Sequence, residues 1–177
     1  MKPAPISKSK PVRTEQIILF RVGGQIFAVS SASVQEVRSV DGFAGLTTEI
    51  HVPGLTKVRQ VVRRGDKTLF VVNGALHFGM PQTRGALFFV LRQTRTALLI
   101  DGIEKMTTMS HLQALPQAFC HEERRWYRGL TALEQSVVPV INPEGFLSAE
   151  ELALLDASFP AEDKPVSEGT GAAEYTQ

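Results

Sequence analysis

Histidine and cysteine are the residues of this chain best suited to bind a metal or to act as nucleophiles. The four histidines, His51, His77, His111 and His121, lack the i, i+4 spacing that places two imidazoles on one helix face, and a single cysteine, Cys120, cannot form a multi-cysteine zinc site. Cys120 and His121 are adjacent, but neighbours in sequence seldom reach the geometry that a thiolate and its base require. These residues therefore predict neither a metal site nor a catalytic pair.

Sequence motifs that bind phosphate or activate a serine are also absent. The chain has no GxSxG elbow, no GxxxxGK[ST] loop and no GxGxxG after a strand, and Gly23 and Gly24, in VGGQ, are typical of a hairpin turn. We therefore expect a protein that is not an enzyme, binds no cofactor and has no small-molecule substrate.

Basic residues gather in the middle of the chain, although 19 Lys and Arg nearly balance 18 Asp and Glu. From Val52 to Ile100 the only acid is Asp66, and the basic residues are Lys57, Arg59, Arg63, Arg64, Lys67, Arg84, Arg92 and Arg95. A second cluster, RRWYR at 124–128, sets aromatic rings among guanidinium groups, as single-stranded nucleic-acid sites do. Its other interpretation is structural: the rings anchor a loop to the core. The near-neutral total favours the structural interpretation, and a basic β-barrel that binds single-stranded nucleic acid is the alternative function.

The elements that carry these residues are mostly β-strands. Short apolar runs bounded by Gly, Pro and Asn predict them: IILFRV, QIFAVS, TLFVVN, ALFFVLR, TALLID and SVVPVIN. One segment, 148–157, predicts a helix, because Ser148 and Glu151 form a capping box and Leu152 and Leu155 share one face. A shorter helical turn is expected at 31–37.

The length and composition, 177 residues with 43% hydrophobic and 21% charged, fit one globular domain. We expect this domain to span 15–159, between disordered tails at 1–14 and 160–177. No apolar run approaches the roughly 20 residues of a membrane-spanning helix, and none follows the basic N-terminus as in a signal peptide. The single cysteine fits a reducing compartment, and we expect a cytoplasmic protein without direct membrane insertion.

An internal repeat organises the predicted strands. A shift of 69 residues aligns Phe20 with Phe89 and carries Leu69, Val71, Val72 and Asn73 onto Val138, Val140, Ile141 and Asn142. Two halves, 17–78 and 86–147, thus repeat one order of strands; chance matching of apolar positions is the other explanation. The repeat predicts two small pseudo-symmetric barrels closed by the helix at 148–157, because closing a sheet removes its unpaired edges.

An ordered set of short strings then resembles the CheW family of chemotaxis coupling proteins. VQEVR at 34–38 is similar to the family's VQEIR, VRRG at 62–65 to NLRG, and DGIEKM at 101–106 to VDGVSDV, with NPEGFLSAEELALLDAS near the C-terminus. The resemblance covers about 17–158. It implies a mainly β fold of two intertwined five-stranded SH3-like barrels with a short C-terminal helix.

The resemblance also implies a function without catalysis. Family members join the cytoplasmic tips of chemoreceptors to the regulatory domain of the histidine kinase CheA, and also contact other CheW-like domains. It would place this chain at membrane-anchored receptor arrays through its partners. Its motif positions that match or replace family residues give the candidate partner-binding residues: Val34, Glu36, Arg38, Arg63, Arg64 and Gly65.

Two questions stay open at these positions. Glu36 and Arg64 either contact a partner or form a salt bridge between the barrels. Val34 lines a partner groove or lies in the core, whereas Val37, Ile103 and Met106 are expected in the core. Val62 and Arg63 replace the Asn and Leu of NLRG, which concentrates positive charge where a kinase would dock.

Overall fold

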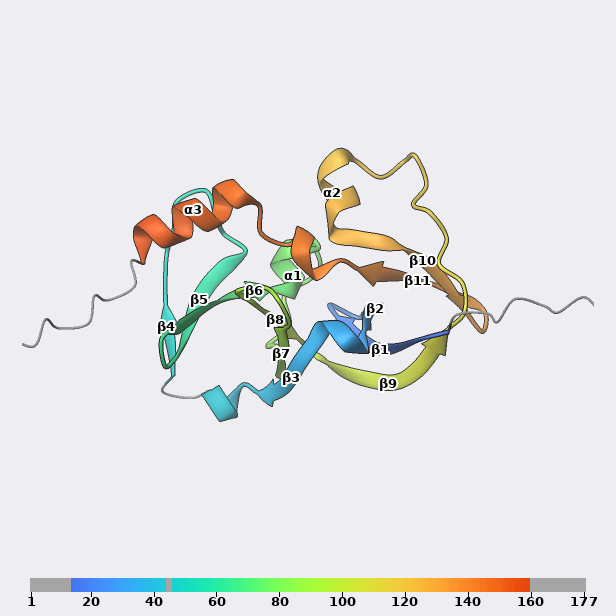
Figure 1. The fold of residues 1–177 in the computed structure, drawn as a ribbon, viewed down its shortest axis with the longest axis horizontal. Helices are drawn as coiled ribbons and strands as arrows, with labels where there is room; N and C mark the ends of the chain where they lie inside the picture. The colour runs from blue at the N-terminus through green and yellow to red at the C-terminus, as the bar shows by residue number, and fades with distance from the viewer. Residues whose placement is uncertain (1–13, 44–45, 160–177) are drawn as a thin grey trace, which may run out of the picture.

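The structure is a computed structural model that describes residues 14–43 and 46–159. Residues 1–13 of the predicted tail at 1–14, and the whole predicted tail at 160–177, lie outside the described residues. Most of the described elements are strands: β1 (Glu15–Val22), β2 (Gln25–Ser30), β3 (Val34–Ser39), β4 (Thr47–Glu49), β5 (Val58–Arg64), β6 (Lys67–Asn73), β7 (Leu87–Leu91), β8 (Thr96–Ile100), β9 (Gly102–Met109), β10 (Tyr127–Leu133) and β11 (Ser136–Ile141). The helices are η1 (Ser31–Ser33), η2 (Asp41–Phe43), α1 (Gly74–His77), α2 (His121–Trp126), η3 (Pro143–Gly145) and α3 (Ala149–Ser158). The mainly β prediction is confirmed (Figure 1).

The strands form two mixed sheets with the same internal order. One sheet runs β10-β11-β2-β1-β9, and the other runs β3-β7-β8-β6-β5-β4. The β1–β2 hairpin of the first half pairs with β9 and β11 of the second, and the β7–β8 hairpin pairs with β3 and β6 of the first. Each half therefore lends a hairpin to the other half's sheet, so the halves are intertwined as predicted.

The pairing register reproduces the 69-residue shift. Ala28 of β2 lies opposite Val140 of β11, and Ala97 of β8 lies opposite Val71 of β6. The second sheet has one strand more than the first, the short strand β4, which pairs with β5. In the first sheet, an isolated bridge between Gln113 and Leu130 lies near the position equivalent to β4. This register, which involves long-range pairs, excludes chance matching as the source of the repeat.

Three apolar clusters fill the described part of the chain. The largest lies between the sheets and includes Phe20 and Phe89, repeat-related rings whose centroids are 5.2 Å apart. Each sheet also encloses a smaller cluster: Ile17, Leu19, Ala28, Met109, Val138 and Val140 in the first, and Phe43, Val62, Leu69, Val71, Phe88, Val90 and Ala97 in the second. Strands β1 and β7 are thus covered on both faces, which explains their continuous apolar sequences.

Four residues with positive φ occupy matching hairpin turns. Gly24 and Gly65 have φ of +82° and +62°, and their repeat equivalents, Gln93 and Glu134, have φ of +60° and +56°. The second half thus keeps the left-handed turn conformation without glycine. A side chain in that conformation carries a steric cost that glycine avoids.

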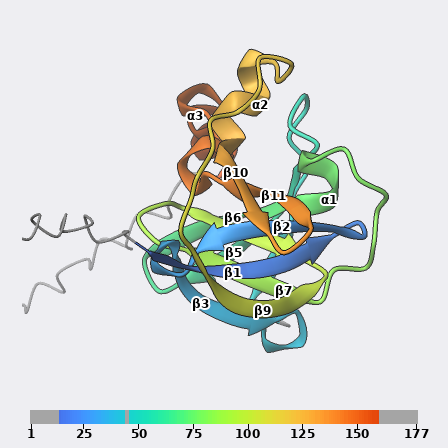
Figure 2. The same cartoon turned by 90° about the vertical axis from the view of Figure 1, so that its right-hand side faces the viewer.

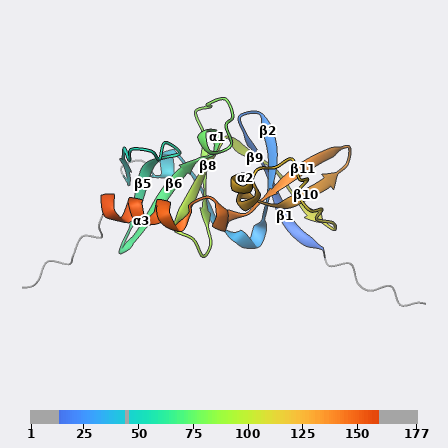
Figure 3. The same cartoon turned by 90° about the horizontal axis from the view of Figure 1, so that it is seen from above.

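Helix α3 lies along the β5–β6 side of the second sheet (Figures 1 and 3). Its capping box joins Ser148 and Glu151 as predicted, and Leu155 is fully buried. The Lys57 ammonium group binds the Glu151 carboxylate at 2.8 Å and donates to the Phe146 carbonyl at 2.7 Å. The helix prediction for 148–157 is confirmed, and the helix is attached by both apolar and charged contacts.

The helical turn expected at 31–37 is wrong over most of its length. Only Ser31–Ser33 are helical, as η1, and β3 begins at Val34. Pairing of Val34, Val37 and Arg38 with β7 imposes the extended conformation, which the local sequence could not reveal.

Candidate partner-binding surfaces

Most of the predicted site residues lie together at one end of the second sheet. Glu36 and Arg38 belong to β3, Arg63 and Arg64 end β5, and Gly65 is in the β5–β6 turn. The Glu36 carboxylate accepts hydrogen bonds from the Arg64 guanidinium group and, at 3.3 Å, from Arg38. One carboxylate therefore serves two guanidinium groups.

The Glu36–Arg64 contact shows how strongly the second sheet curls. In the sheet order, β3 and β5 are separated by β7, β8 and β6. With neighbouring strands about 4.8 Å apart, a flat sheet would hold them about 19 Å from each other. The ion pair therefore closes one curled sheet. Of the two interpretations left open, the salt bridge is present, but it lies within one sheet and not between the two barrels; contact of Glu36 or Arg64 with a partner stays a prediction.

The first sheet has a similar ion pair of opposite polarity. Lys105 of β9, the repeat equivalent of Glu36, binds Glu134 of the β10–β11 turn at 3.1 Å. Glu134 is in turn the equivalent of Gly65. The two ends of the molecule thus share a backbone arrangement but carry different charges.

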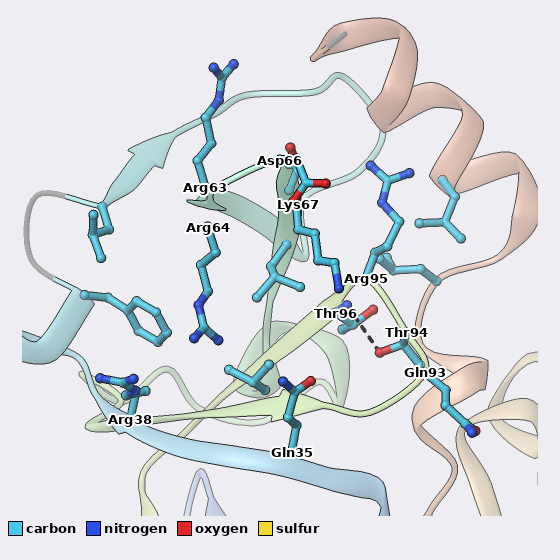
Figure 4. A pocket seen from close by; sticks show the side chains of 18 of the residues that line it. Gln35, Arg38, Arg63, Arg64, Asp66, Lys67, Gln93, Thr94, Arg95 and Thr96 are labelled. Atoms are coloured by element: carbon cyan, nitrogen blue, oxygen red, sulfur yellow. Dashed lines mark hydrogen bonds between the residues drawn. The ribbon is translucent and has the colours of Figure 1, made fainter. Parts of the chain in front are cut away.

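A wide hollow opens beside Arg38 and Arg64. It has a volume of about 1570 Å³ and lies among β3, the β5–β6 turn, the β7–β8 turn and α3. In Figure 4, Arg64 extends into this hollow toward Arg38 and Lys67 extends into it toward Thr96, whereas Arg63 extends away. Phe43, Leu69 and Val90 contribute apolar lining. We call this feature the basic hollow.

The apolar candidates are distributed differently from the prediction. Val34 is 8% exposed and belongs to the central cluster, which supports its core interpretation. Val37, Ile103 and Met106, expected in the core, are 39%, 39% and 61% exposed. The register shift between Val34 and Glu36 pairs Val34 with Leu91 and Val37 with Phe89, which both belong to the central cluster. The two valines therefore face the same side of the sheet, and only Val34 is covered there.

The exposed apolar residues Val37, Val40, Ile103 and Met106 define what we call the edge-strand surface. Val37 lies on β3, Ile103 and Met106 lie on β9, and Val40 directly follows β3. Strands β3 and β9 are the edges of their sheets, and both lie on the same side of the molecule (Figures 1 and 2). This surface thus combines apolar side chains with strand edges that have no partner in the described structure.

The aromatic and basic cluster at 124–128 has a structural role. The Arg124 guanidinium group donates to the carbonyls of Pro116 and Phe119 at 2.7 and 3.2 Å. Trp126 and Tyr127 pack against the central cluster, and burial raises the pKa of Tyr127 to about 12. The rings that nucleic-acid bases would stack on thereby anchor α2 and, through the contact of Tyr127 with Phe119, its preceding loop. This use of the rings removes the main support for the nucleic-acid alternative.

Cys120 and His121 also have positions that their local structure explains. The Cys120 sulfur caps α2 by accepting a hydrogen bond from the Glu123 amide at 3.5 Å. The Glu123 carboxylate in turn accepts a hydrogen bond from the Cys120 amide. His121 is the first residue of that helix. The described residues contain no cluster of three or more potential metal ligands from His, Cys, Asp and Glu.

His77 is a buried polar residue that the sequence analysis missed. Its ring is 5% exposed, contacts Trp126, Phe146 and Phe78 with centroids 4.3, 4.8 and 4.9 Å away, and has neither nitrogen hydrogen-bonded within the described structure. Burial, with a smaller effect from Lys57, lowers the pKa of His77 to about 3. The repeat could have indicated that His77 is buried, because the 69-residue shift aligns it with the buried Phe146.

The fold and its surfaces define a class of protein: a two-sheet β scaffold that presents an apolar edge surface and a basic end. Residues 16–151 match the family described as the CheW-like domain. The chain therefore belongs to the CheW-like family, and the recognition made from the sequence is confirmed.

Individual relatives agree with this assignment. The chain is 27% identical over 143 residues to a probable chemotaxis protein CheW of Rhizobium etli, covering 77% of this chain and 89% of the relative. It is 27% identical over 156 residues to the chemotaxis protein CheW of Rhizobium meliloti, covering 84% and 90%. The crystal structure of the scaffolding protein TtCheW from Thermoanaerobacter tengcongensis superposes with a TM-score of 0.63 at 10% identity, covering 78% of this chain and 96% of that one, which supports the predicted fold.

Within the described residues, the helices are too short or too polar to cross a bilayer.

Proposed function

We propose that this protein is a non-enzymatic chemotaxis adaptor that couples the cytoplasmic tips of chemoreceptors to the regulatory domain of a CheA-type histidine kinase. The observation that carries the proposal is the CheW-like match across residues 16–151. The proposal places the protein in the cytoplasm, at membrane-anchored receptor arrays, through its partners, which include other CheW-like domains.

The edge-strand surface supports a role in receptor binding. An amphipathic helix of a receptor tip presents apolar side chains in a stripe, and such stripes bind grooves or faces lined by apolar residues. Met106 and Val37 offer such contacts while the core beneath them stays intact. Val34, which is 8% exposed, offers little surface for such contacts.

The end of the second sheet supports a role in kinase binding. Arg63, Arg64 and Gly65 form the end of β5 and the following turn, and Glu36 and Arg38 lie beside them. Positive charge at this end favours an acidic partner surface and accelerates encounter more than it strengthens the final complex. We therefore expect the association rate to fall as salt rises past about 0.15 M, where the Debye length is roughly 8 Å.

The test is to measure binding of the purified chain to a receptor-tip fragment and to a kinase regulatory domain separately. Met106→Asp should weaken receptor binding at least about tenfold and leave kinase binding unchanged, since it desolvates a charge against an apolar stripe. Leu154→Asp is the matched control, because Leu154 is 45% exposed but lies on α3, and it should affect neither. A folded protein that binds neither partner would contradict the adaptor function.

Two arginine variants test the kinase end. Arg64→Glu should weaken kinase binding strongly, whereas Arg63→Leu should mainly reduce the dependence of the association rate on salt. Receptor binding should change little in both. Equal losses for both partners would mean that Arg64 serves only to close the second sheet through Glu36.

A further inference from the structure

The basic hollow carries a small excess of positive charge, because five basic residues line it against the carboxylates of Asp66, Glu144 and Asp156 in its lining and of Glu36 beside it. Arg38 and Arg64 share the single carboxylate of Glu36, and Arg95 pairs with Asp156 of α3 at 2.7 Å. The Lys67 ammonium group, which extends into the hollow, has no ion-pair partner in the described part of the chain (Figure 4). The hollow therefore favours an occupant with negative charge.

The remaining lining and the size of the hollow narrow the kind of occupant. Gln35, Thr94 and Thr96 add hydrogen-bonding groups around the apolar lining. The volume of about 1570 Å³ exceeds the roughly 300–1,000 Å³ of pockets that enclose small molecules. An acidic peptide segment with some apolar side chains matches both the chemistry and the size better than a single small ligand.

One such segment is part of this chain. Phe159 lines the hollow and is the last described residue, and residues 160–177 follow it. They contain Glu162, Asp163, Glu168 and Glu174 against one basic residue, Lys164, and they include Val166 and Tyr175. Segment and hollow are therefore complementary in charge and in apolar content.

Because the segment 160–177 is covalently attached beside the hollow, it can bind there even if its intrinsic affinity for the hollow is low. Residue 168 is nine positions beyond Phe159, so an extended chain reaches up to about 30 Å, enough to cross the hollow. Attachment through a short linker gives an effective concentration of about millimolar, which an untethered acidic peptide must match.

We propose that the acidic segment 160–177 binds in the basic hollow and competes there with acidic partner surfaces for Arg38, Arg64 and Lys67. Binding is weak, intramolecular and sensitive to salt, because its charged contacts are partly exposed. The inference rests on the hollow and on the sequence, and holds whichever protein binds this end.

The test uses the full chain with one nitroxide label. Cys120→Ser removes the exposed cysteine and keeps a good helix-capping side chain, and Ala172→Cys provides the labelling site. At about 0.05 M salt, amide signals of Gly65 and Thr94 should lose at least half their intensity relative to the reduced label. At about 0.5 M salt, where screening is strong, they should recover.

Charge variants separate binding from mere proximity of an attached segment. Lys67→Glu should restore the amide signals, and adding Glu168→Lys and Glu174→Lys to it should broaden them again. Arg59→Glu is the matched control, because Arg59 is an exposed residue of β5 that lies outside the hollow, and it should change nothing.

Three results would overturn the proposal. The first is a lack of broadening at low salt, and the second is broadening that Lys67→Glu and high salt leave unchanged. The third is a nucleotide or oligonucleotide that shifts the hollow's amides without displacing the label, since that assigns the hollow to another ligand.

Discussion

The buried imidazole of His77 makes the stability of this protein depend on pH in a predictable way. The pKa of His77 is about 3 in the folded protein and about 6.5 in an unfolded chain. Below pH 6.5 the unfolded state binds a proton that the folded state rejects, so stability falls as the pH is lowered toward 3. Each pH unit in that window costs about 1.4 kcal/mol, and lowering the pH from 7.5 to 4 therefore costs about 3 kcal/mol.

His77→Phe isolates this contribution. Phenylalanine occupies the equivalent position, Phe146, and it removes two ring nitrogens that have no hydrogen-bond partner in the described structure. The free energies of unfolding of both proteins should be measured by urea titration, followed by circular dichroism, from pH 4 to 8. Because His51, His111 and His121 are present in both, their effects cancel. The advantage of the variant should grow by about 3 kcal/mol between pH 7.5 and 4. If the difference in free energy of unfolding between the two proteins stays constant with pH, the His77 ring is hydrated or protonated in the folded state and the reasoning is wrong. As a second variant, His77→Leu should give the same pH dependence as His77→Phe.

Three further predictions concern turns, core and helix. Gln93→Gly and Glu134→Gly should each raise the free energy of unfolding by about 1 kcal/mol, because both residues have positive φ. Gly24→Ala, at an equivalent turn, should lower it. A loss of stability in both Gln93→Gly and Glu134→Gly would contradict the strain argument. Val34→Asp should unfold the domain in circular dichroism, since it buries a charge, whereas Val37→Asp should leave a folded protein; a folded Val34→Asp would return Val34 to the partner surface. Ser148→Ala should destabilise the protein by about 1 kcal/mol in urea titration by removing the cap of α3, and an unchanged midpoint would mean that α3 frays without consequence.

Local and periodic features of this fold could be predicted from the sequence. The capping box at Ser148 is set by residues three positions apart, and the turn at Gly23 and Gly24 by two adjacent glycines. The repeat extended the prediction to topology, because one shift relates the pairing of Ala28 with Val140 to that of Ala97 with Val71. Periodicity of this kind needs no knowledge of distant contacts.

Features that depend on distant contacts could not be predicted. Val37 and Met106 have apolar side chains like their buried neighbours, and only their place on edge strands exposes them. Glu36 and Arg64 were singled out by resemblance, but their contact depends on how far the second sheet curls. The burial of His77 depends on Trp126 and Phe146, which come from the other half of the chain.

The two halves have one backbone plan and different surfaces, and this difference bears on how one small chain could hold unlike partners. Equivalent core positions stay apolar, as Leu69 and Val138 do, because each sheet encloses an apolar cluster. Equivalent surface positions differ in charge. Glu36 corresponds to Lys105, so the edge strand contributes the acid to the ion pair at one end of the molecule and the base to the ion pair at the other. An acidic partner that fits the basic end would meet the like charge of Glu134 at the opposite end. Such like-charge contacts discriminate against wrong partners more strongly than favourable contacts reward right ones. Duplication of the core thus gives both ends a similar backbone arrangement, while divergence of a few charges gives the two ends different surface chemistry.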